Sequence, residues 1–187
     1  EGDEWMPEID RTPDHKRECT LAPNEIIDKI REAGIVGLGG AQFPTHVKLS
    51  VPNDQKAEWV IINGVECEPY LSSDYRNMVE RAEMILTGTE IVMRAVGVSR
   101  AVIGVENNKP DAIAHLREVI ARDNYKGIEV MPLKMRYPQG GEKQLIAAVT
   151  GRQVPPPPAL PISVGAVVCN VSTAIAIYEA VQKNKPL

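Results

Sequence analysis

Residues 101–133 read AVIGVENNKPDAIAHLREVIARDNYKGIEVMPL, and their hydrophobic pattern changes period twice. The runs 101–105 and 128–133 are short, apolar and rich in β-branched residues, as buried strands are. Between them, apolar residues recur at helical spacing over 110–122. A strand, a helix and a second strand in this order are typical of a parallel sheet, because the crossover between parallel strands places a helix on the face of the sheet.

Further elements of the same kinds lie on either side of this stretch. We predict a helix from Pro23 that ends before Gly34, a strand at 59–62, one or two helices across 74–96, a helix at 142–150, a strand at 166–169 and a helix from Ser172. Within 74–96, Gly88 is either a helix break or a point of close packing. The predicted fold class is α/β, a mostly parallel sheet with helices on both faces, and ligands of such sheets bind beyond the carboxyl ends of the strands.

The length and composition are those of one domain. The chain has 187 residues, of which 43% are hydrophobic, enough for one substantial core. Residues 1–20 are polar and contain Pro7 and Pro13, so we interpret them as an extended lead-in from an upstream domain and 21–187 as the α/β domain. Because the sequence begins at Glu1 and not at a methionine, we expect it to be a piece of a longer chain.

Charge and residue distribution argue against nucleic-acid binding, membrane insertion and metal binding. The net charge is −4 and Lys and Arg are dispersed, so the basic patch of a nucleic-acid binder is missing. No apolar run approaches the roughly 20 residues of a membrane-spanning helix, so we expect no direct membrane insertion. Three cysteines and three histidines lack ligand spacing, which predicts reduced thiols and no protein-bound metal. These residues are Cys19, Cys67, Cys169, His15, His46 and His115.

The segment GLGGAQFPT, residues 37–45, is the first candidate ligand site. It follows a helix and lacks the third glycine of a dinucleotide fingerprint, and it lacks the lysine of a phosphate-binding P-loop. Adjacent glycines nevertheless let the backbone pass close to a planar ligand and turn N–H groups toward it. A structural tight turn is the alternative interpretation of the same residues.

Polar residues follow two predicted strands. Asn63, Glu66 and Glu68 come after the strand at 59–62, where carboxylates would accept hydrogen bonds from ribose hydroxyls or a carboxamide. A solvated acidic loop is the alternative. Asn170 and Thr173 stand between a strand and a helix, where an anion site and an ordinary helix cap are equally consistent with the sequence.

One basic residue stands close to the glycine-rich segment. Lys48 would place a positive charge beside a cofactor phosphate or ring, because a lysine provides a point charge for phosphates. A solvated surface lysine is the more common situation for this residue type.

Four segments in order resemble one family: GLGGAQFPTHVKL (37–49), INGVECEP (62–69), YPQGGEKQLI (137–146) and VCNVST (168–173). They are similar to the FMN-binding flavoprotein subunit of respiratory complex I and, more closely, to the C subunit of the Rnf electron-transport complex. The resemblance runs from about residue 20 to the end of the chain. It implies a Rossmann-like α/β domain that binds FMN and NADH.

The resemblance also implies residue roles. Residues expected at the cofactors are Gly37, Gly39, Gly40, Ala41, Phe43, Lys48, Asn63, Glu66, Glu68, Gly141, Glu142, Asn170 and Thr173. Among them, Phe43 would stack on the nicotinamide, Glu66 and Glu68 would border the NADH pocket, and Glu142 would lie near the flavin. Hydride transfer needs no protein acid or base at the reacting carbon, so we expect binding residues and no catalytic ones.

The function implied is that of an NADH-dependent oxidoreductase subunit. The domain would take hydride from NADH, or return it, through FMN. Electrons would then pass to 4Fe-4S clusters elsewhere in the parent chain, in ion-translocating NADH:ferredoxin electron transfer. The implied partners are ferredoxin and the other Rnf subunits, and the implied location is peripheral, on the cytoplasmic side of the cell membrane.

Three positions depart from the complex I pattern. Gln42 stands in place of a glycine, Val65 in place of an aspartate, and Lys143 in place of a glutamate. Two other functions stay open, each for its own reason. One is the flavin domain of a cobalamin reductase of the propanediol-utilisation type, which has similar segments. The other is a non-catalytic docking module that has lost FMN, with the bulky Gln42 as its motive.

Overall fold

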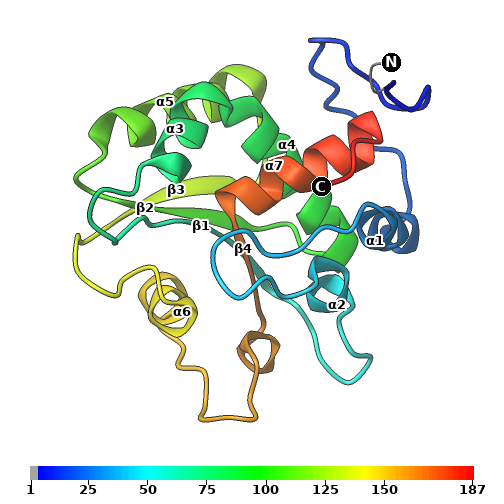
Figure 1. Cartoon of the computed structure of the whole chain (residues 1–187). Coiled ribbons are helices and arrows are strands. Elements are labelled where there is room, and N and C mark those ends of the chain that lie inside the picture. The colour runs from blue at the N-terminus through cyan, green and yellow to red at the C-terminus, as the bar shows by residue number, and fades with distance from the viewer. Residues whose placement is uncertain (1–3) are drawn as a thin grey trace.

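Four parallel strands form the sheet at the centre of this protein, whose computed structural model describes residues 4–187. Their order is β3-β2-β1-β4, so β3 and β4 are the edge strands (Figure 1). The strands are β1 (Trp59–Gly64), β2 (Ala101–Glu106), β3 (Ile128–Leu133) and β4 (Ala166–Asn170). Asn63 and Gly64 stay in the sheet although they form a turn signal, because both pair in register with β2.

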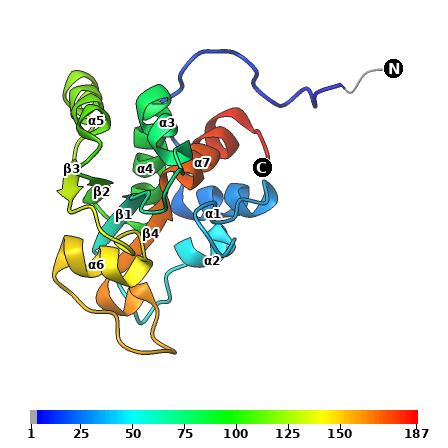
Figure 2. The same cartoon turned by 60° about the vertical axis from the view of Figure 1, so that its left-hand side comes forward.

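Helices cover both faces of the sheet unequally (Figures 1 and 2). The larger layer contains α1 (Pro23–Glu32), α3 (Ser73–Glu80), α4 (Ala82–Val96), α5 (Pro110–Asp123) and α7 (Val171–Lys183), whereas the opposite face carries α6 (Glu142–Thr150) and the 3-10 helix η1 (Pro161–Val164). The short helix α2 (Thr45–Leu49) packs beside α1. The α/β class and the parallel sheet with helices on both faces are thus confirmed.

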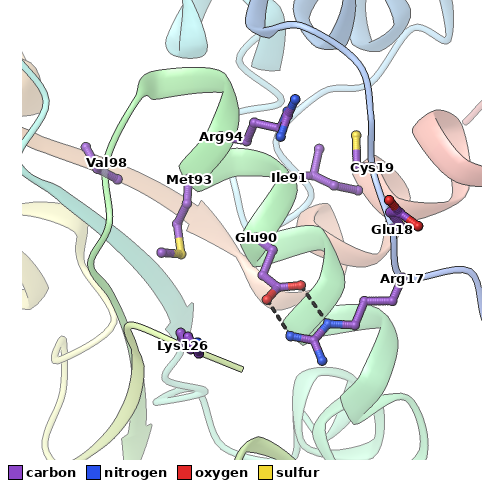
Figure 3. A pocket seen from close by; sticks show the side chains of 9 residues that line it. All are labelled: Arg17, Glu18, Cys19, Glu90, Ile91, Met93, Arg94, Val98 and Lys126. Carbon is purple, nitrogen blue, oxygen red and sulfur yellow. Dashed lines mark hydrogen bonds and ion pairs between the residues drawn. The ribbon is translucent and has the colours of Figure 1, made fainter. Parts of the chain in front are cut away.

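The lead-in before α1 has no helix or strand between residues 4 and 21, and it packs on the large helical layer. The His15 ring stacks on the Tyr178 ring at a centroid distance of 5.0 Å, and His15 Nε2 lies 2.9 Å from Thr87 Oγ1. Arg17 donates two hydrogen bonds to the Glu90 carboxylate of α4 (Figure 3). The first three residues of the predicted lead-in lie outside the described residues.

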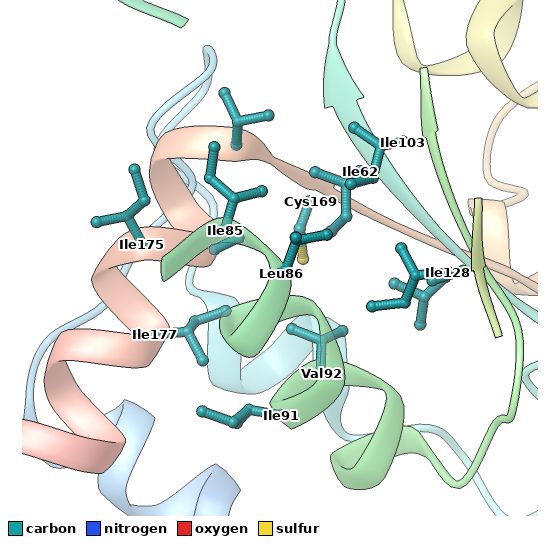
Figure 4. Packing of buried hydrophobic residues seen from close by; sticks show 14 of the residues in the cluster. Ile62, Ile85, Leu86, Ile91, Val92, Ile103, Ile128, Cys169, Ile175 and Ile177 are labelled. Atoms are coloured by element: carbon teal, nitrogen blue, oxygen red, sulfur yellow. The ribbon is translucent and has the colours of Figure 1, made fainter. Parts of the chain in front are cut away.

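The main core lies between the sheet, α4 and α7. Figure 4 shows Leu86 of α4 beside Cys169 and Ile62 of the strands, and isoleucines of α4 and α7 belong to the same buried cluster. Each buried side chain of this size contributes about 1.5–3 kcal/mol when it leaves water. Gly88 is a point of close packing, since a Cβ there would lie 2.0 Å from the Ala174 carbonyl oxygen. The break between α3 and α4 falls instead at Arg81.

Candidate functional site

A cavity of about 670 Å³ lies at the carboxyl ends of β1 and β4 and continues along β4, the edge strand. Its volume is within the range of about 300–1,000 Å³ that is usual for cofactor sites. One wall is the glycine loop, defined as residues 37–43, and other walls come from α2, the start of α6 and η1. The cavity is therefore at the edge of the sheet where ligands of parallel sheets bind.

The cavity brings together most of the residues singled out in the sequence. Those that line it are Gly37, Gly39, Gly40, Ala41, Phe43, Lys48, Asn63, Gly141, Glu142, Asn170 and Thr173. They come from four segments that lie far apart along the chain, so the topology and not the local sequence gathers them. Glu66 and Glu68 are not among the lining residues.

The glycine loop is held at both ends and at its middle. Gly37 N donates to Phe43 O at 2.9 Å, which closes the loop, and an isolated bridge pairs Val36 with Pro44. Leu38 N donates to Thr173 Oγ1 at 2.9 Å and so ties the loop to the first turn of α7. At its three glycines the loop lines the cavity with backbone atoms alone.

The two central glycines meet different surroundings. A Cβ on Gly39 would lie 2.9 Å from the Asn170 Cβ, so this position is closed by the protein itself. A Cβ on Gly40 would meet no protein heavy atom within 4 Å. Gly40 lines the cavity, and no protein atom lies close to where its side chain would be, so the backbone here could come close to a flat ligand.

Gln42 is exposed and also lines the cavity. The cavity has its volume of about 670 Å³ with this side chain in place. The residue has a φ of 53°, in the left-handed region that favours glycine. The consequence of a glutamine at this position is therefore mainly one of backbone conformation, because the cavity volume remains large with the side chain in place.

Lys48 places a positive charge in the cavity wall. Its ammonium donates to the Val168 carbonyl oxygen at 2.9 Å and lies 3.2 Å from Glu142 Oε1. The ion pair joins α2 to α6 across the edge of β4. Such a half-exposed pair contributes about 0–1 kcal/mol to stability.

Asn63 fixes the two loops at the carboxyl edge. Its Nδ2 donates to Gly140 O at 2.9 Å, and its Oδ1 accepts from Val65 N at 3.0 Å. The residue thereby holds the segment before α6, which carries Gly141 and Glu142, next to the end of β1.

Asn170 both caps a helix and faces the cavity. Its Oδ1 accepts a hydrogen bond from Ser172 N at 2.8 Å, which satisfies one of the free donors at the start of α7. The two interpretations of this residue that the sequence left open are therefore compatible. Thr173 is buried and takes part in the same turn.

Glu66 does not line this cavity, and its carboxylate is engaged by the start of α3 and by Lys109. Its carboxylate accepts hydrogen bonds from Asp74 N at 2.9 Å and Tyr75 N at 3.2 Å, and Lys109 Nζ lies 3.2 Å away. Burial by itself would raise the pKa of Glu66, but the hydrogen bonds from Asp74 and Lys109 outweigh it and lower the pKa. The carboxylate therefore stabilises the start of α3, while Glu68 lies exposed in the following loop.

Apart from the glycine loop, most of the apolar part of the cavity lies outside the sequence motifs, which supply only Val47, Val168 and Cys169. Its side chains come from α2, from the loop after it, and from η1: Val47, Val51, Pro52, Leu160, Pro161 and Ile162. The edge of β4 supplies Ala166, Val167, Val168 and Cys169. Only the folded chain shows that these elements flank the same edge strand.

No group of three or more His, Cys, Asp or Glu side chains arranged to hold a metal ion is found within residues 4–187. Over the same range, no helix is long and apolar enough to cross a membrane. Burial raises the pKa of the Cys169 thiol to about 11, so this cysteine in the cavity wall is a neutral apolar group.

Known proteins match the chain at three levels. A family model described as the Nuo51 FMN-binding domain matches residues 30–179. The C subunit of the proton-translocating ferredoxin:NAD(+) oxidoreductase complex of Clostridium ljungdahlii is 46% identical over 99% of the chain and 39% of that subunit. The C subunit of the Na(+)-translocating complex of Acetobacterium woodii is 52% identical over 84% of the chain and 35% of that subunit.

A solved structure agrees with these matches. A chain of the NAD+-reducing [NiFe]-hydrogenase in its air-oxidized state superposes with a TM-score of 0.71, at 26% identity over 86% of this chain and 30% of that chain. The present chain thus spans about a third of the length of the relatives that it matches.

Proposed function

Since this chain belongs to the Nuo51 FMN-binding domain family and is a homologue of the C subunits of ion-translocating ferredoxin:NAD(+) oxidoreductases, we propose that its cavity binds FMN and that it is the flavin domain of such a protein. The observation that carries the proposal is the open space in front of Gly40, in a cavity of about 670 Å³ with a lysine in its wall. Both the family and the shape of the site fit a planar, phosphorylated cofactor.

The chain's own residues would divide the work of holding FMN. The glycine loop would let the ring system approach main chain, and Lys48 would provide positive charge. Free N–H groups in the first turn of α7, beside Asn170 and Thr173, would favour an anionic group. Asn63 would keep the Glu142 segment in place against the cofactor.

FMN, when bound, would supply hydride acceptance from NADH and the release of electrons one at a time. The protein's part would be to stack the nicotinamide against the flavin, to exclude water and to hold both rings in register. Phe43 is exposed at the cavity and is the proposed stacking residue for the nicotinamide. Glu68, exposed after β1, remains the proposed contact for the NADH ribose.

The wider role concerns parts of the parent protein beyond this chain. Electrons would leave FMN for 4Fe-4S clusters in the remainder of the parent protein. Ferredoxin and the other subunits of the complex would be the partners, with this domain peripheral on the cytoplasmic side of the membrane. We favour the flavin domain over a docking module without FMN because the cavity has a volume of about 670 Å³ with Gln42 in place.

The proposal is tested by titrating the protein with FMN while flavin fluorescence is followed, and then by adding NADH without oxygen. We expect one FMN per chain with quenching at micromolar protein, and loss of flavin absorbance on addition of NADH. Absence of quenching would contradict the flavin site. Quenching without reduction by NADH would contradict the nicotinamide part alone.

A further inference from the structure

A half-buried carboxylate lies next to the site, behind the residues that line it. Asp74, in the first turn of α3, accepts a hydrogen bond from Asn170 Nδ2 at 2.7 Å and from Ser172 Oγ at 3.0 Å. Both donors belong to the junction of β4 and α7, so a single side chain of α3 binds the two polar residues of that junction.

These contacts leave Asn170 one orientation. Its Oδ1 accepts from Ser172 N, and its Nδ2 donates to the Asp74 carboxylate at 2.7 Å and more weakly to the Asn63 carbonyl oxygen at 3.5 Å, so the Asp74 carboxylate is the nearer of the two acceptors that orient the amide nitrogen. The hydrogen bond to a carboxylate is charge-assisted and about twice as strong as a neutral one. Asn77 Nδ2 donates to Ser172 Oγ at 2.9 Å and holds the hydroxyl in line.

The fixed amide in turn supports the glycine loop. Asn170 atoms would lie 2.9–3.1 Å from a Cβ on Gly39, which shows that the loop backbone rests directly on this side chain. Rotation of the Asn170 amide would therefore change the surface against which this part of the loop packs. Asp74 itself is not among the lining residues.

We propose that Asp74 is a positioning residue of the FMN site, which acts through Asn170 by setting the orientation of that amide against Gly39. The inference rests on the proposed function, because it concerns the affinity for FMN. Asp74 does not touch the cavity, so its effect must pass through Asn170.

The test combines a structural and a binding measurement on the whole chain. In the protein without FMN, the Asn170 side-chain amide protons are followed by NMR in wild type and in Asp74→Ala. We expect one amide proton to be shifted by the carboxylate and protected from exchange in wild type, and to lose both properties in the variant. A shift unchanged by Asp74→Ala would overturn the proposal without reference to FMN.

The binding part is a double-mutant cycle on the FMN Kd. We expect Asp74→Ala to weaken FMN about tenfold and Asn170→Ala at least as much, with little further loss in the double variant, because the two act in series. Asp74→Asn, which keeps the shape and one acceptor, should lose less. Glu80→Ala is the matched control, an exposed carboxylate on the same helix, and should leave the Kd unchanged.

Additive losses, or an Asp74→Ala protein that binds FMN as wild type does, would overturn the positioning role. If Asp74→Ala fails to fold, the same cycle is made with Asp74→Asn, and the same two outcomes decide. If the wild type binds no FMN, both the proposed function and this inference are contradicted. If the wild type binds FMN and only the cycle fails, the inference alone is contradicted.

Discussion

The backbone of Gly39 rests on the side chain of Asn170, whose Cβ would lie 2.9 Å from a Cβ on the glycine. The next glycine, Gly40, faces open space. Substitutions at the two positions therefore distinguish a loss of stability from a loss of FMN affinity at constant stability. We expect Gly40→Ala to leave the unfolding temperature unchanged and to weaken FMN at least tenfold, because Gly40 lines the cavity and its new methyl group would meet no protein atom. Gly39→Ala should lower both, and Gly39→Val should abolish FMN binding.

A thermal melt and an FMN titration of these variants decide the matter. Should Gly40→Ala bind FMN with the affinity of wild type, the glycine loop would not be the wall against which the flavin lies.

Gln42 tests the alternative of a domain that has lost its cofactor. Its φ of 53° costs about 1–2 kcal/mol for a residue with a Cβ. A glycine avoids this cost but loses more chain entropy on folding, which offsets part of the benefit. Gln42→Gly should therefore raise the free energy of unfolding by up to about 1 kcal/mol. Its FMN Kd should stay within about threefold of wild type, because the exposed side chain leaves the cavity open. An affinity gain above tenfold would mean that Gln42 obstructs the site.

The two carboxylates after β1 should behave differently. Glu66→Gln should lower the free energy of unfolding by about 1–2 kcal/mol, since the buried carboxylate receives hydrogen bonds from α3 and Lys109. Glu68→Gln should leave stability and FMN binding unchanged and weaken NADH. Equal loss of FMN and NADH affinity in Glu68→Gln would show that this carboxylate is misplaced in our account. Urea unfolding and ligand titrations measure the two effects.

Cys169 is expected to be chemically silent near neutral pH. Burial raises the pKa of its thiol to about 11, so little thiolate is present at pH 8. Iodoacetamide at pH 8 should therefore modify the partly exposed Cys19 and Cys67 before Cys169, as peptide mass spectrometry would show. Since the unfolded thiol ionises near 9.0 and the folded one near 11, Cys169 contributes stability below pH 9 that is lost as the pH rises toward 11. Rapid alkylation of Cys169 in the folded protein would contradict this burial.

His15 makes the free energy of unfolding depend on pH in the acidic range, whereas Cys169 does so in the alkaline range. Burial against α4 and α7 lowers the pKa of His15 below its ordinary value of 6.5. The nearby charge of Glu83 opposes this shift, and those of Lys183 and Arg17 add to it. The unfolded chain thus takes up the proton first, so the free energy of unfolding should fall as the pH decreases below 6.5. His15→Phe, which keeps an aromatic ring on Tyr178, should reduce this slope in urea unfolding between about pH 7.5 and about pH 5.5. An unchanged slope would place the titration elsewhere.

The sequence predicts the fold well where burial alone determines the pattern. The strand at 128–133 and the helix at 142–150 have the predicted bounds, because a short, mostly apolar segment after Gly127 and an amphipathic segment that ends at Gly151 are local signals. Gly88 shows the limit. Its tight contact with Ala174 joins helices far apart in the chain, and no local pattern separates close packing from a helix break.

The same limit applies to the site. The glycine loop and Lys48 stand in recognisable segments, whereas the direction of Glu66 depends on Lys109, which lies 43 positions away. Asp74 looks like any acidic residue in the first turn of a helix, and only its hydrogen bond to Asn170, across 96 positions, connects it to the cavity. Contacts of this length are set by topology and are absent from the local sequence pattern.

A crystal structure of the protein soaked in FMN tests the central claim most directly. We predict flavin density in the cavity beside β4, with the ring system against Gly40 and with Lys48 and the first turn of α7 in contact with the ligand. Flavin bound at another surface, or Gln42 folded into the cavity with the glycine loop closed behind it, would contradict the account.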